Sequence, residues 1–315
     1  MNRPNEDLWI TYQGDQGPGI GKHIVLVSGD EEYRSEEGLP MLAKILAVHH
    51  GFKCTVLFAI DPETGTIDPE TLDNIPGLHH LDTADMMIML TRFRELPDEQ
   101  MKHIIDYTDR GKPVMGLRTA THAFKYVKNR QSPYAKYSCE DDQFEGGYGR
   151  QVLGETWVKH HGIHGKESTR GVIDEENRMH PVLRGVQDIW GPTDVYATTE
   201  ITGEPQILVW GQVLTGMDPK DDPNLDKPRM PIAWMKSYTG EEGRTSRVFC
   251  TTMGASVDLE SSGLRRLLVN ACYWGMEMDD DIHDECIVEY VGEYNPTFFG
   301  YGTHAKGVRP SDHTL

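Results

Sequence analysis

Residues 116–124, GLRTATHAF, follow the apolar segment PVM and lead toward a short helix. In many α/β enzymes a strand-to-helix turn of this kind presents a serine or cysteine nucleophile. This turn instead carries Arg118, Thr119, Thr121 and His122. Arginine offers planar, multi-donor binding and threonine offers a hydroxyl, so the turn predicts polarisation of a bound oxygen rather than nucleophilic attack.

Further polar residues follow other expected strands. Because the carboxyl ends of parallel strands meet at one edge of an open sheet, we expect these residues to surround one pocket for a hydroxyl-rich or anionic small molecule. The arginines could instead pair with the acids as a structural ion network. The predicted binding residues are Asp30 and Glu31 after the first strand, Arg92 and Arg94 after the third, Thr119 and Thr121 in the turn, and Ser256 after a late strand.

The segment HHGIH supplies a second group of reactive side chains, His160, His161 and His164. Glycines in and after it disfavour a continuous helix, so we expect a loop. Three histidines with a nearby carboxylate (Glu155 or Glu167) could hold a divalent metal such as zinc and leave a position open for substrate. The alternative is acid–base chemistry, because an ordinary histidine exchanges protons near neutral pH.

The elements that must position these residues alternate between strand and helix. Strands followed by helices at this spacing predict an α/β fold with a doubly wound, mostly parallel sheet. Apolar runs predict strands at 23–28, 53–58, 86–90 and 113–117, with later strands at 168–173, 195–199, 207–213, 231–238 and 247–253. Helical spacing predicts helices at 35–50, 96–111 and 261–275.

Three segments lie outside this alternation. Residues 1–22 read as a glycine-rich N-terminal arm, and residues 127–167 form a long polar insertion with one short helical turn near 150–153. An insertion of that length in a compact domain is usually functional or mobile. Residues 277–315 form an irregular C-terminal tail whose aromatic residues should pack on the body.

Composition restricts the partners of the chain. A formal net charge of −19 argues against nucleic acid or an anionic membrane as partner, because both require a basic surface. The five cysteines are scattered without a C-x-x-C pair. The N-terminus is too polar for a signal peptide, and no apolar stretch is long enough for a membrane span. We therefore expect a soluble protein, cytoplasmic as the chain stands, or secreted or periplasmic if a leader was removed.

Several segments together resemble the trehalose-utilisation (ThuA-like) family of the class I glutamine-amidotransferase-like superfamily. They are GKPVMGLRTATHAF, HIVLVSGDEEYRSEE, HPVLRGVQDIWGPTDVY, RVFCTTMGAS and GLRRLLVNACYWGME. The resemblance covers residues 23–276 and implies a flavodoxin-like fold. In this resemblance Arg118 stands where the amidotransferases have their nucleophilic cysteine. The resemblance therefore implies their fold but excludes glutaminase activity. Arg118 and Ala255 stand where the family commonly has histidines, and His161 best matches the family's histidine in the insertion.

The resemblance implies an enzyme of carbohydrate metabolism that isomerises or cleaves an oxidised (3-keto) glycoside. Such a reaction needs a base beside the carbonyl and a group that stabilises the enolate. His161 or His122 would be the base, and Arg118 with Arg92 would stabilise the oxygen. The alternative is a non-catalytic carbohydrate-binding or regulatory module on the same scaffold. The expected partner is a small-molecule carbohydrate, and a homo-oligomer is left open.

Overall fold

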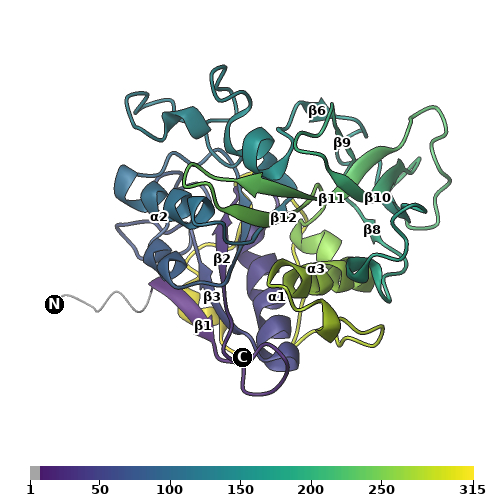
Figure 1. Ribbon diagram of the computed structural model, residues 1–315, viewed down its shortest axis with the longest axis horizontal. Coiled ribbons are helices and arrows are strands. Elements are labelled where there is room, and N and C mark those ends of the chain that lie inside the picture. Colours follow the sequence, from purple (N-terminus) through teal and green to yellow (C-terminus); the bar gives the residue numbers. More distant parts are fainter. Residues whose placement is uncertain (1–7) are drawn as a thin grey trace.

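Within residues 8–315, which the computed structural model describes, five parallel strands form the centre of the sheet in the order β3-β2-β4-β5-β12 (Figure 1). Every residue of β2 and β4 is buried, as expected for apolar runs covered on both faces. These strands are β2 (His23–Gly29), β3 (Lys53–Leu57), β4 (Met86–Thr91), β5 (Val114–Leu117) and β12 (Thr245–Thr251).

Antiparallel strands extend both edges of this core. The added strands beyond β12 are β11 (Met230–Thr239), β10 (Gln206–Val213), β7 (Thr169–Ile173) and β8 (Trp190–Gly191). On the other edge β1 (Trp9–Tyr12) pairs with β3. The segment 1–22 was expected as an arm without a packed element, and its first seven residues lie outside the described ones. β1 forms because it covers the otherwise unpaired backbone groups of an edge strand.

Helices cover both faces of the sheet, which confirms the doubly wound α/β fold. Helices α1 (Ser35–His50) and α3 (Ser262–Gly275) contribute to one apolar cluster, and α2 (Asp98–Asp109) contributes to the other. Gly51 ends α1 with a φ of 81°, a left-handed conformation that glycine adopts without strain. Among residues 8–315, every helix is too short or too polar to span a lipid bilayer.

The insertion 127–167 contains short elements and leads into a separate pair of strands. A π-helical turn covers Gly149–Leu153, close to the expected turn. β6 (Lys159–His160) pairs with β9 (Tyr196–Ala197) in a two-stranded sheet. The short 3₁₀ turns are Leu78–Asp82, Arg118–His122, Ala135–Tyr137, Pro181–Leu183, Ser256–Glu260, Asp279–Asp281 and Pro310–His313.

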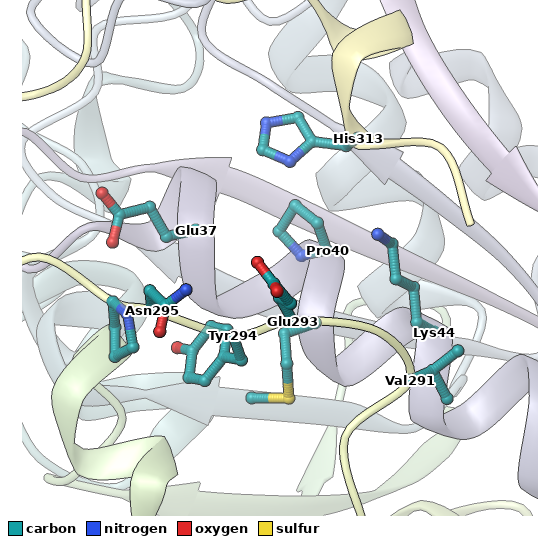
Figure 2. A pocket seen from close by; sticks show the side chains of 10 residues that line it. Glu37, Pro40, Lys44, Val291, Glu293, Tyr294, Asn295 and His313 are labelled. Atoms are coloured by element: carbon teal, nitrogen blue, oxygen red, sulfur yellow. The ribbon is translucent and has the colours of Figure 1, made fainter.

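The C-terminal tail lies against α1. Its Ile282 and Val288 are buried in the same apolar cluster as α1 and α3. A pocket of about 150 Å³ separates the tail from α1, with Glu37 on the helix and Glu293 and Asn295 on the tail (Figure 2). The tail is therefore held on the body, and its later residues reach the carboxyl ends of the strands.

Candidate functional site

Arg118 is the first residue after β5 and adopts a left-handed backbone conformation, with a φ of 44°. Its side chain is fully buried. One guanidinium nitrogen, Nη1, donates to the carbonyl oxygens of Asp194 and Thr252, each at 2.8 Å. The other, Nη2, donates to Oδ1 of Asp194 at 3.0 Å. The sharp turn thus delivers a positive charge to a buried carboxylate.

Two tyrosine rings enclose this guanidinium. Its Cζ lies 4.5 Å from the ring centre of Tyr33 and 3.9 Å from that of Tyr196. Burial raises the pKa of Tyr33 to about 12 and raises that of Tyr196 well above its ordinary value, so both hydroxyls stay protonated. Both rings line the adjacent cavity, whereas Arg118 does not. Arg118 was predicted to polarise a substrate oxygen, but the structure places it behind the cavity wall.

Asp194 joins the arginine to two histidines of the insertion. His160 Nδ1 lies 2.6 Å from Asp194 Oδ2, and His164 Nδ1 lies 3.1 Å from Oδ1. Burial alone would raise the pKa of Asp194, but the charge of Arg118 and the histidine hydrogen bonds outweigh it and hold this pKa below its usual range. The carboxylate can only accept, so both Nδ1 atoms donate. In neutral His160 this leaves Nε2 as the acceptor.

A cavity of about 150 Å³ opens in front of this group. Within it, His122 is buried, and burial together with the nearby charges of Arg92 and Arg118 holds its pKa well below its ordinary value. His122 is therefore a neutral hydrogen-bonding group near neutral pH. The lining residues come from strand ends, the insertion and the tail: Glu32, Tyr33, Arg92, His122, Trp157, His160, Tyr196 and Tyr301.

Several predicted binding residues are used in the scaffold instead. Asp30 accepts hydrogen bonds from the backbone nitrogens of Glu32 and Tyr33 and from the hydroxyl of Thr119. These bonds fix the loop after β2 to the turn after β5. Asp30 and Thr119 are both buried and do not line the cavity, contrary to the predicted substrate-binding role.

Glu31 and the two arginines after β4 form the ion network that the sequence left as an alternative. Arg94 is fully buried and donates to Glu31 Oε2 at 2.7 Å and to the carbonyl oxygens of Pro69 and Thr71. Arg92 also pairs with Glu31. Arg92 alone of these three residues lines the cavity.

The remaining predicted residues point to other partners. The hydroxyl of Thr121 donates to the carbonyl of Arg118 at 3.3 Å, and that of Ser256 donates to the carbonyl of Thr297 at 3.2 Å. His161 Nε2 lies 2.8 Å from the carbonyl oxygen of Pro228. His161 belongs to the same short segment as His160, but its ring is committed outside the cavity. The predicted trio of His160, His161 and His164 is therefore not assembled.

A different set of three potential metal ligands does converge. One ligand atom from each of His160, His164 and Asp194 lies within 4.8 Å of the others. The carboxylate in this set is Asp194 and neither of the predicted glutamates. Glu155 binds Arg150, and Glu167 binds Lys227. Two ligands of a tetrahedral zinc, each at 2.0–2.2 Å from the ion, are separated by roughly 3.3 Å. The 2.6 Å between His160 Nδ1 and Asp194 Oδ2 is instead a hydrogen-bond distance.

Several important residues were missed by sequence reasoning. Asp194 precedes its strand, whereas most of the predicted site residues follow strands. Its motif TDVY belongs to one of the segments that resemble the ThuA-like family. Trp157 and Tyr301 come from the insertion and the tail, where no periodicity guides a prediction. The signal that could have found them is the concentration of aromatic residues in otherwise irregular segments.

The similarity of this chain to known proteins is structural. No family model and no curated protein matches the sequence. A solved structure from Bacteroides uniformis, described as ThuA-like, shares 16% identity, with 87% of this chain and 98% of that chain covered and a TM-score of 0.50. Another described in the same way, from Parabacteroides merdae, shares 13% identity over 89% and 97% of the two chains, with a TM-score of 0.51. This chain therefore has the flavodoxin-like α/β fold of ThuA-like proteins.

Proposed function

We propose that this chain is an enzyme that acts on an oxidised (3-keto) glycoside by removing a proton beside its carbonyl group. The observation that carries the proposal is the state of His160. Its Nδ1 is hydrogen-bonded to the buried, ionised Asp194, while its ring lines a cavity. A histidine oriented in this way has one fixed tautomer and one nitrogen ready to accept a proton.

The cavity wall suits a sugar. Tyr33, Trp157 and Tyr196 offer aromatic surface for the C–H face of a sugar ring. Glu32 and Arg92 offer a carboxylate acceptor and guanidinium donors for hydroxyl groups. A few polar groups among aromatic side chains is the usual composition of a small-molecule site.

In the proposed reaction His160 takes the proton from the carbon between the carbonyl and the glycosidic carbon. The electron pair of that C–H bond moves toward the carbonyl oxygen, and the resulting enolate lies near Arg92 and neutral His122, which can stabilise it. Isomerisation then moves the proton of the neighbouring hydroxyl to the enolate oxygen, and His160 returns its proton to the former carbonyl carbon. In cleavage the enolate electrons reform the carbonyl and make a C=C bond to the glycosidic carbon, whose bond to the glycosidic oxygen breaks. His160 gives its proton to that departing oxygen. Arg118 does not line this cavity and acts through Asp194, so we assign it as a positioning residue.

A divalent metal such as zinc is the competing interpretation of the same three residues. His160, His164 and Asp194 would hold it, and it would supply Lewis-acid polarisation of the carbonyl. The 2.6 Å between His160 Nδ1 and Asp194 Oδ2 favours the acid–base assignment.

Proton exchange tests the proposed function directly. A 3-keto glycoside incubated with the protein in D₂O should gain deuterium beside the carbonyl, detected by mass spectrometry. His160→Ala should lose this exchange, and His161→Ala, an adjacent histidine outside the cavity, should keep it. Sugar binding without exchange or turnover in the unmodified protein would instead support the non-catalytic binding module.

A further inference from the structure

The tail segment 297–303 crosses the candidate site and is anchored at both ends by Arg34. This arginine is fully buried, and its Nε donates to the hydroxyl oxygen of Thr297 at 3.1 Å. Its Nη2 donates to the hydroxyl oxygen of Thr303. Glu37 on α1, visible in Figure 2, also accepts from the backbone nitrogen of Thr297 at 2.7 Å. The ends of the segment are therefore fixed to the start of α1.

Between these anchors, Phe299 and Tyr301 face the site in different ways. Phe299 is buried, and its ring centre lies 5.5 Å from that of Tyr33 and 5.0 Å from that of His164. Tyr301 lines the cavity although the residue is 56% exposed. One part of Tyr301 thus borders the cavity and the rest borders solvent, which is the position of a residue at the mouth.

The hydroxyl of Tyr301 bridges two groups at that mouth. It donates to Glu32 Oε2 at 2.6 Å and accepts from Arg92 Nη2 at 2.8 Å. Tyr301 thereby engages one atom of each charged group, and their remaining atoms can still bind sugar hydroxyls. Tyr301 therefore limits the cavity by its ring.

Tyr301 is flanked by two glycines whose backbone conformations other residues rarely adopt. Gly300 has a φ of 152° and Gly302 a φ of 66°. A Cβ atom at these positions would approach neighbouring atoms only to 3.8 Å and 3.5 Å, which are ordinary contacts. Glycine is thus required for backbone conformation and not for lack of space. Tyr301 therefore sits between two glycines within a segment whose ends are fixed.

We propose that Tyr301 is a specificity-determining residue that closes the cavity around a single sugar unit. The inference rests on the proposed carbohydrate substrate but not on the proposed proton abstraction. The cavity, of about 150 Å³, is smaller than the roughly 300–1,000 Å³ usual for drug-sized ligands, so it suits a ligand of about one sugar ring. A glycoside with a small group attached would fit beneath Tyr301, whereas a bulky group would meet its ring.

Calorimetry tests this inference by measuring the affinity for two 3-keto glucosides. One carries a methyl aglycone and the other a bulky aromatic aglycone. The unmodified protein should bind the methyl glycoside at least tenfold more tightly. Tyr301→Ala should remove most of this preference. Tyr301→Phe should keep it, because the ring remains while the hydroxyl is lost. Phe298→Ala, a change at an exposed aromatic residue of the same segment, should have no effect.

Fluorescence of the free protein gives a readout without any sugar. The quenching of Trp157 by acrylamide is obtained by subtracting the signal of the Trp157→Phe variant. This quenching should increase when Tyr301→Ala opens the cavity. Unchanged quenching together with an unchanged preference would overturn the inference, as would a failure of the unmodified protein to bind either sugar. Failure of the proposed reaction alone would appear as absent deuterium exchange with the binding preference intact.

Discussion

Two histidine pairs lie at opposite ends of the parallel strands and differ in their partners. The ring centres of His160 and His164 are 5.1 Å apart, and those of His79 and His80, just before β4, are 4.6 Å apart. Asp194 binds both rings of the first pair. The second pair packs against the ring of Trp9.

The difference shows that a buried carboxylate, and not the number of histidines, marks the candidate site. The hydrogen bond to Asp194 raises the pKa of His164. Burial and the neighbouring His79 lower that of His80. Neighbouring imidazoles therefore favour the neutral form unless a carboxylate accepts a hydrogen bond from the ring. Of the two pairs, the one bound to Asp194 has its tautomer defined beside a cavity.

The largest expected difference between the two pairs is in activity. His160→Ala should lower turnover of a keto-glycoside about 10²–10⁴-fold, the usual contribution of a general base. His79→Ala removes an exposed ring at the other end of the sheet and should change turnover less than twofold. Steady-state kinetics of both variants measures this, and equal losses would remove the distinction between the pairs.

Stability should depend strongly on the charge behind Asp194. Arg118→Met leaves a buried carboxylate without its main cation and should cost about 3–5 kcal/mol of unfolding free energy. Arg178→Met removes an exposed arginine paired with Glu175 and should cost at most about 1 kcal/mol. Urea unfolding provides the comparison. A small loss in Arg118→Met would mean that the histidines alone satisfy Asp194.

The two pairs should respond to pH with opposite sign. His80 has a lowered folded pKa, so its contribution to stability is present above pH 6.5 and lost as the pH falls. His164 has a raised folded pKa, so its contribution is full below pH 6.5 and lost as the pH rises through the folded value. Relative to the unmodified protein, His80→Gln should therefore gain stability at pH 5.5 and His164→Gln should lose it.

Melting temperatures between pH 5.5 and 8 measure these two trends. Each effect should be under about 1 kcal/mol, because both rings are partly exposed and solvent screens their interactions. Parallel trends in the two variants would show that Asp194 does not control His164.

The smallest expected effect is that of metal removal. If His160, His164 and Asp194 form a hydrogen-bonded group, a chelator should change turnover less than twofold. Elemental analysis of the purified protein checks the same point. One bound metal per chain, with activity lost in chelator and restored by zinc, would instead assign these residues as a metal centre.

The fold was predictable because its signals are local. Apolar runs such as 23–28 and 86–90 are long enough to be buried on both faces of a sheet, and their helices have regular apolar spacing. The antiparallel direction of β10 and β11 was not predictable, because a strand's own residues do not specify its partner. The short strand β1 was missed because its role depends on the exposed edge of β3.

Part of the candidate site could be predicted from two signals. Of the predicted residues that line the cavity, Arg92 and His122 follow strands, and His160 belongs to a segment rich in histidine. The strand-end signal failed for Asp30 and Arg94, because the polar groups beneath a pocket occupy the same strand ends as those that line it. Asp194 and Tyr301 could not be found in this way, because long-range packing brings them to the site.

The turn at Arg118 has a consequence for chemical labelling. Electrophilic probes that alkylate an active-site thiol find no target there. Cys54, Cys250 and Cys272 are buried, and burial raises the pKa of each well above its ordinary value. Cys139 and Cys286 are both partly exposed, but burial raises the pKa of Cys139 to about 11. Cys286 on the tail is therefore the thiol that such reagents should modify first, and the adduct would label the tail and not the candidate site.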